Sequence, residues 1–164
     1  MPKATPPPAD AKLVARRMEK LHSLLAKVAY GKLRNTYDSR TRVYDISPGQ
    51  GASDLGFPLF DGERFLTISE RHIVLNRELV RLAYRYQLSW PDNAAFTHPN
   101  EWIFRFDFDV EWRRRLGFAG KPHLNVHHPE PVGPDRMHYP TPAGFRAELF
   151  FEIVRVHFPQ ATKR

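Results

Sequence analysis

Two histidines in the segment HLNVHH are the first residues whose type and spacing suggest chemistry. On a strand, His123 and His127 would share one side with Asn125, because successive side chains alternate across the pleat. Metal-free RNA cleavage needs a base for the proton of the ribose 2′-hydroxyl and an acid for the leaving oxygen. Histidine suits both tasks, since its unperturbed pKa lies near neutrality. The pattern predicts that His123 and His127 bracket a phosphate and divide these two roles.

Charged side chains alternate with apolar ones in two further segments, 78–90 and 102–112, and a period of two is typical of strands with one buried side. The paired N–H donors of an arginine guanidinium match two phosphate oxygens and would stabilise the negative charge that develops on the phosphate. An aspartate could orient a histidine and stabilise its charged form. If all three segments cover one core, they place these groups on a common surface. The charged members are Arg81, Arg85, Arg105, Asp107 and Asp109.

Other basic residues extend this candidate surface. The segment 113–122 contains three consecutive arginines and two glycines, so we expect an exposed connection from which Arg113 and Arg114 contact a phosphate backbone. A solvated turn is the alternative. His128 would join the site only where its strand ends or bulges, and His138 is a further candidate contact.

Three alternatives to a metal-independent nuclease stay open. Arg105 could simply form ion pairs with the nearby aspartates. His123, His127 and Asp107 could instead bind manganese, iron or zinc, although no cofactor is our first expectation. The basic surface could also grip nucleic acid without cleaving it, as in an assembly subunit. The chain has neither a GxSxG elbow nor the GxxxxGK[ST] phosphate loop.

Composition favours a basic, intracellular protein with a polyanionic partner. The 164 residues carry a formal net charge of +7, and a basic surface attracts nucleic acid, although solubility alone also explains such a charge. Cysteine is absent, which excludes disulfides and thiolate chemistry. No apolar run is long enough for a membrane span, and the first residues do not resemble a signal peptide. We therefore expect a cytoplasmic protein that does not contact a membrane.

The elements that must position these groups form one α+β domain. Residues 1–9 are expected to be a flexible proline-rich tail, and residues 10–164 the domain. A helix is predicted over 10–30 and another after Thr141, the latter with a stripe formed by Phe145, Leu149, Ile153 and Val156. Between them we expect an antiparallel sheet of about four to six strands, covered by both helices mainly on one face.

The order of these segments resembles the TumE-like toxins of bacterial toxin–antitoxin modules over roughly residues 60–157. The shared pattern begins with YRYQL and with a turn that contains the residues Asp92 to Ala94, followed by a histidine-proline pair. It continues with FRFDFD, HLNVHHPE and a last amphipathic helix. The resemblance implies a small α+β ribonuclease, a hydrolase acting on RNA and neutralised by an antitoxin encoded beside it. This chain departs from the pattern at residues 95–97, which separate the turn from its histidine, and in its added N-terminal helix and tail. The implied site residues are Arg105, Asp107, His123, His127 and His128.

Overall fold

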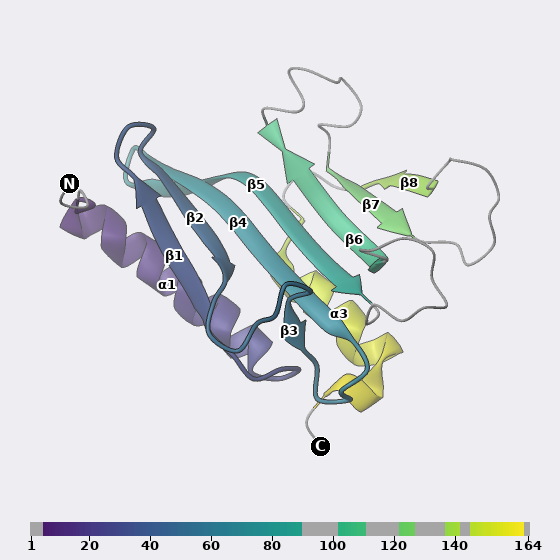
Figure 1. The fold of residues 1–164 in the computed structure, drawn as a ribbon. Helices are drawn as coiled ribbons and strands as arrows, with labels where there is room; N and C mark the ends of the chain where they lie inside the picture. The colour runs from purple at the N-terminus through teal and green to yellow at the C-terminus, as the bar shows by residue number, and fades with distance from the viewer. Residues whose placement is uncertain (1–4, 90–101, 111–121, 127–136, 142–144, 163–164) are drawn as a thin grey trace.

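The structure is a computed structural model that describes residues 5–89, 102–110, 122–126, 137–141 and 145–162. For residues 102–103, 123–126 and 137–140 it describes the backbone alone. Two helices, a short 3₁₀ helix and a set of strands follow one another along the chain (Figure 1). Their bounds are α1 Pro8–Leu25, β1 Leu33–Asp38, β2 Val43–Pro48, β3 Phe57–Pro58, β4 Phe65–Leu75, β5 Glu78–Ser89, β6 Trp102–Asp109, β7 His123–Val126, β8 Met137–Pro140, α3 Ala147–His157 and η2 Pro159–Ala161.

The strands form one antiparallel sheet in the order β1-β2-β4-β5-β6-β7-β8, with the two-residue β3 paired to β4. Figure 1 shows α1 and α3 side by side behind this sheet, while the opposite face carries neither helix. The α+β class and the placement of both terminal helices on one face are confirmed. The five longer strands β1, β2, β4, β5 and β6 fall within the four to six expected, and the short β3, β7 and β8 extend the described sheet.

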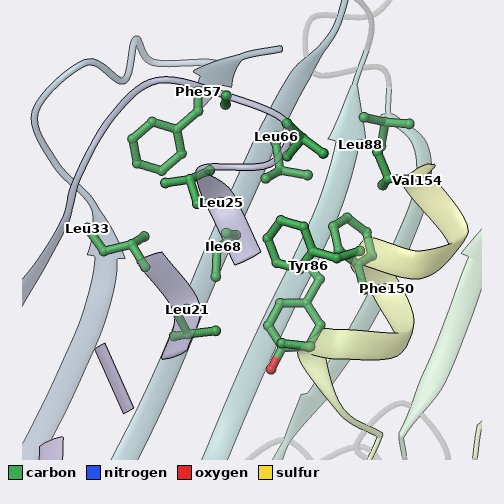
Figure 2. Packing of buried hydrophobic residues seen from close by; sticks show 14 of the residues in the cluster. Leu21, Leu25, Leu33, Phe57, Leu66, Ile68, Tyr86, Leu88, Phe150 and Val154 are labelled. Carbon is green, nitrogen blue, oxygen red and sulfur yellow. The ribbon is translucent and has the colours of Figure 1, made fainter. Parts of the chain in front are cut away.

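The core lies between the sheet and the two helices (Figure 2). Every second side chain is buried there from Leu66 to His72 in β4 and from Tyr84 to Leu88 in β5, as one-sided strands require. The helices contribute their own buried stripes, with α1 packing through Leu21 and Leu25 and α3 through Phe150 and Val154. Aromatic rings connect the layers: the rings of Phe106 and Phe145 stack with centroids 4.0 Å apart. We refer to the side of the sheet that packs on the helices as the inner face and to the other side as the outer face.

The helix boundaries differ from the expected ones. Helix α1 begins at Pro8, because proline is well tolerated in a first turn, and it ends at Leu25. Helix α3 begins at Ala147 rather than after Thr141, and its buried residues are Ala147, Phe150, Phe151 and Val154.

The apolar stripe predicted for the last helix is therefore confirmed in part. Phe145 is buried and Ile153 packs against the core, but the other two members are exposed. Leu149 and Val156 are 50% and 56% exposed, whereas Phe150 is fully buried. Residues 147–157 are apolar at most positions, so periodicity alone does not select the buried side. The aromatic residues of the sheet select it instead, since the ring of Phe150 packs against those of Tyr86, Phe104 and Phe106.

A β-bulge interrupts the alternation of β5. Arg71 pairs with Ala83, but the next residue of β4, His72, pairs with Arg81, so Leu82 is the extra residue. Residues of β5 before the bulge are thereby shifted by one position relative to those after it. As a result, Arg81 and Arg85 lie on opposite faces of the sheet although they are four positions apart.

Two hairpin turns hold arginines in the left-handed region of backbone conformation. The two-residue turn between β4 and β5 has positive φ at Asn76 (49°) and Arg77 (64°), as in a type I′ turn, and Arg42 (56°) ends the turn between β1 and β2. Glycine and asparagine favour such positions, whereas arginine does not.

None of the helices in the described part of the chain combines the length and the apolar character that crossing a bilayer requires.

Candidate functional site

A row of polar positions crosses the outer face at its centre. Arg85 of β5 is the cross-strand partner of Asp107 in β6, and Asp107 is in turn the partner of His123 in β7. Directly opposite residues of antiparallel strands lie on the same side of the sheet. Three of the predicted site residues are thus brought to one row, which we call the Arg85 row.

A second row lies two residues along the strands. Gln87, Arg105 and Asn125 are consecutive cross-strand partners, and Asn125 is also the partner of His138. Arg105 links the two rows within β6, since its Nε donates to Oδ2 of Asp107 at 2.6 Å. Both side chains are about one-fifth exposed. The ion pair suggested as an alternative for Arg105 is therefore present, although along one strand rather than across two.

Chemically, this part of the outer face combines an exposed arginine, an ion-paired carboxylate and a histidine position. Arg85 is exposed, so its side chain is accessible to an anion. Asp107 is held in place by Arg105 and lies opposite the backbone of His123. A carboxylate beside an imidazole can fix its orientation and stabilise its protonated form.

Arg81 does not belong to this surface, which corrects the prediction that it joins Arg85. The bulge turns Arg81 to the inner face, where its guanidinium donates to the Tyr86 hydroxyl at 2.8 Å and to the carbonyl oxygen of Phe145. It also lies 3.7 Å from the carboxylate of Glu70 and over the ring of Tyr84. Arg81 is a structural residue of the core.

The spacing of the two histidines does not support a shared phosphate on a regular strand. Four residues span about 13 Å at the rise of a β-strand, which is too far for two imidazoles to contact one phosphate. The described part of β7 is His123–Val126. His127 itself, together with His128, Arg113 and Arg114, lies outside the described residues.

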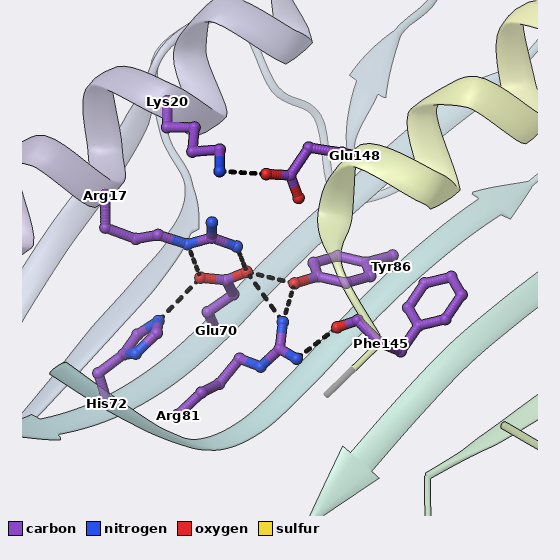
Figure 3. A network of polar contacts seen from close by, with 8 residues as sticks. All are labelled: Arg17, Lys20, Glu70, His72, Arg81, Tyr86, Phe145 and Glu148. Atoms are coloured by element: carbon purple, nitrogen blue, oxygen red, sulfur yellow. Dashed lines mark hydrogen bonds and ion pairs between the residues drawn. The ribbon is translucent and has the colours of Figure 1, made fainter. Parts of the chain in front are cut away.

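A second polar cluster, which the sequence did not predict, is buried between α1, β4 and β5 (Figure 3). Its centre is Glu70, whose side chain is fully buried. The carboxylate accepts hydrogen bonds from the Arg17 guanidinium, with Nε at 2.7 Å, and from the Tyr86 hydroxyl. His72 Nε2 lies 2.8 Å from the same carboxylate. The signal in the sequence was an acidic residue on the apolar side of a strand, after Leu66 and Ile68. Above this cluster, Lys20 and Glu148 join α1 to α3 through an ion pair.

The electrostatics of this cluster keep Glu70 charged and Tyr86 neutral. Burial alone would raise the pKa of Glu70, but hydrogen bonds from Arg17, His72 and Tyr86 and the charge of Arg17 outweigh it and hold that pKa far below its usual range. Burial, together with the nearby Glu70 carboxylate, raises the pKa of Tyr86 well above 10. The Arg17 guanidinium gains from the carboxylate more than it loses by burial, so its pKa is raised too. Glu70 is enclosed by protein donors, and we interpret the cluster as a structural clamp rather than as a reaction site.

The alternative metal site is not complete within the residues described. Among them, no group of three or more histidine, aspartate or glutamate side chains is close enough together to hold a metal ion. Two proposed ligands, Asp107 and His123, are cross-strand partners, whereas His127 falls outside the described ranges.

Comparison of this chain with protein-family models, with curated proteins and with solved structures found no match.

Proposed function

We propose that this chain is a toxin-like, metal-independent endoribonuclease that cleaves RNA on the outer face of β5, β6 and β7. The observation that carries the proposal is the register that aligns Arg85, Asp107 and His123 in one row. This row supplies a phosphate-binding cation, a carboxylate and a histidine position on a face that carries neither helix. The formal net charge of +7 supports a polyanionic substrate.

In the proposed reaction, His123 removes the proton of a ribose 2′-hydroxyl while Asp107 stabilises the resulting imidazolium. The 2′-oxygen attacks phosphorus, the bond from phosphorus to the 5′-oxygen breaks, and an acid protonates that leaving oxygen. His127 is the candidate acid. The products are a 2′,3′-cyclic phosphate and a free 5′-hydroxyl. Arg85 holds the phosphate oxygens as charge develops on them.

The resemblance to TumE-like toxins supplies the remaining parts of the proposal. It supports an antitoxin partner encoded beside this chain and a cytoplasmic site of action. The segments that carry the resemblance include β5, β6 and β7, which are also the strands that form the Arg85 row. A small antitoxin-like reading frame next to the gene would support this part of the proposal, and a gene for a large effector complex would count against it.

The direct test is incubation of purified protein with RNA in the presence of EDTA. We expect cleavage with cyclic-phosphate ends, and a loss of about 100-fold or more in rate for His123→Ala, since general acid–base catalysis contributes about that much. His157→Ala is the matched control, because His157 is exposed on α3. Absence of cleavage under all conditions, or a His123→Ala variant that cleaves like the control, would overturn the proposal.

A non-catalytic RNA-binding subunit is the second candidate. It is favoured by the net charge and by the ion pair that already engages Arg105. It predicts salt-sensitive RNA binding that survives both His123→Ala and His127→Ala. A metal-dependent nuclease would instead retain metal on purification, lose it with His127→Ala and lose activity in EDTA.

A further inference from the structure

The Arg85 row does not stop at β5. In the direction of β1 its next member is Ser69 of β4, the cross-strand partner of Arg85. The pairing of Ile46 with Glu70 then brings Ser47 of β2 level with Ser69, and Ser47 is the partner of Arg34 in β1. Arginine and serine positions thus continue the row across the outer face to the first strand of the sheet.

Side-chain contacts agree with this register. Arg34 is exposed, and its Nε donates to the Ser47 hydroxyl at 3.2 Å, so the guanidinium lies along the row. Ser47 and Ser69 are half-buried and carry only short hydroxyl side chains. The two serines in the middle of the row therefore project less from the sheet than the exposed arginines that flank them, Arg34 and Arg85.

The distribution of charge on the outer face favours these two arginines as the anion contacts. Two other arginines of this face are ion-paired, Arg71 with Asp45 at 3.0 Å and Arg105 with Asp107. Within the described part of the chain, neither Arg34 nor Arg85 has a carboxylate in contact. Asp38, at the end of β1, accepts hydrogen bonds from Arg40 N and Thr41 Oγ1 in its own turn, and Asp109 lies in the adjacent row.

We infer that single-stranded RNA lies along this row, with Arg34 binding a phosphate several nucleotides away from the one that is cleaved beside His123. Adjacent strands are about 4.8 Å apart, so the three steps from β1 to β5 separate Arg34 from Arg85 by about 14 Å, and five steps separate it from His123 by about 24 Å. An extended strand over that distance holds on the order of four nucleotides, which is at the low end of the range for single-strand-binding grooves. The inference rests on the proposed function in taking RNA as the ligand.

Binding of 2′-O-methyl RNA, which cannot be cleaved, tests this inference separately from catalysis. We expect Arg34→Gln to weaken binding of an eight-nucleotide strand about fivefold and to reduce its salt slope by about 0.7, the contribution of one phosphate contact on a single strand. Binding of a three-nucleotide strand, measured by competition, should weaken less, because so short a strand can also bind at Arg85 and His123 without reaching Arg34. Arg16→Gln is the matched control, since Arg16 is exposed on α1, on the other side of the sheet.

A second variant tests the middle of the row. Ser69→Glu places a carboxylate between the two arginines and should weaken binding of the eight-nucleotide strand at least tenfold. The inference is overturned if Arg34→Gln binds that strand as tightly as Arg16→Gln does, or if it weakens binding of both lengths equally. A parent protein that binds but does not cleave RNA would overturn the proposed function and leave the RNA path intact. A parent that cleaves RNA, with Arg34→Gln binding like Arg16→Gln, would overturn only the path.

Discussion

Arg17 of α1 and Glu70 of β4, 53 residues apart in the chain, form a hydrogen-bonded ion pair that fastens the first helix to the centre of the sheet. The Glu70 side chain is fully buried, and Arg81 and Tyr86 of β5 contact the same carboxylate. One acidic residue therefore connects α1 to the consecutive strands β4 and β5.

Replacing Glu70 by glutamine should lower the free energy of unfolding by about 3 kcal/mol, because removing one partner of a buried ion pair leaves the other charge uncompensated. Urea denaturation followed by circular dichroism measures this change. The control is Glu152→Gln, which removes an exposed carboxylate paired with Arg155 on α3 and should leave the urea midpoint unchanged. Equal midpoints for the two variants would contradict the assignment of Glu70 as a clamp.

Stability should also depend on pH through Glu70. Its pKa in the folded protein is lowered from 4.5, so its contribution is complete above that value and is lost as the pH falls through the acid range. We expect the free energy of unfolding of the parent to decline below about pH 5. The Glu70→Gln variant should show a shallower decline over the same window. Parallel pH profiles for parent and variant would show that other carboxylates dominate.

Substitutions at the two arginines of β5, Arg81 and Arg85, should have different effects on stability and on RNA binding. Arg81→Gln removes charge-assisted hydrogen bonds to Tyr86 and Phe145 and should destabilise the fold by about 2 kcal/mol. Arg85→Gln changes an exposed side chain on the outer face, so it should keep the parent's urea midpoint and reduce RNA binding and cleavage. The same substitution at both positions makes each the control for the other. A larger loss of stability for Arg85→Gln than for Arg81→Gln would contradict the placement of Arg81 on the inner face.

Neighbouring residues of α3 test which of its sides is buried. Phe150→Ala should cost about 3 to 4 kcal/mol, since it removes a fully buried ring that packs against Tyr86, Phe104 and Phe106. Leu149→Ala should cost far less, because Leu149 is half exposed. Thermal or urea unfolding of both variants provides the measurement. A larger loss of stability for Leu149→Ala than for Phe150→Ala would show that Leu149 is on the buried side of the helix, as the periodicity predicted.

Glycine at the second position of the β4–β5 turn should make the protein more stable than arginine does. Arg77 has φ 64°, a conformation that costs side chains with a Cβ roughly 1 kcal/mol, so Arg77→Gly should raise the melting temperature by about 2 to 4 °C. Arg40→Gly in the neighbouring turn is the control, since Arg40 is not among the residues with positive φ. A gain at Arg40 but not at Arg77 would contradict this account.

Much of the layered fold could be predicted from the sequence because strands with one buried side repeat apolar residues at every second position. This alternation correctly placed Arg85, Arg105 and Asp107 on the outer face. It failed at Arg81, because a bulge depends on how two strands pair and not on the pattern of either strand alone. Periodicity also failed in part for α3, where apolar residues surround most of the helix and the sheet decides which of them are buried.

The buried cluster was beyond sequence reasoning for a different reason. Its partners come from α1, β4, β5 and the segment before α3, and Arg17 lies 53 residues from Glu70, so no local window contains both members of the central ion pair. A glutamate on the apolar side of a strand indicates that some partner exists. Only the three-dimensional arrangement shows that the partner is Arg17.

The order of the strands has a consequence for how this chain is made on the ribosome. Neighbours in the sheet from β4 to β8 are also neighbours in sequence, so each can pair soon after it is synthesised. The aromatic rings of β5 and β6 that pack on α3, however, must wait for residues 147–157, which are translated last among the main elements. Until then the aromatic side chains of β5 and β6 are not covered by α3. Exposed apolar surface of this kind promotes aggregation and is what chaperones bind.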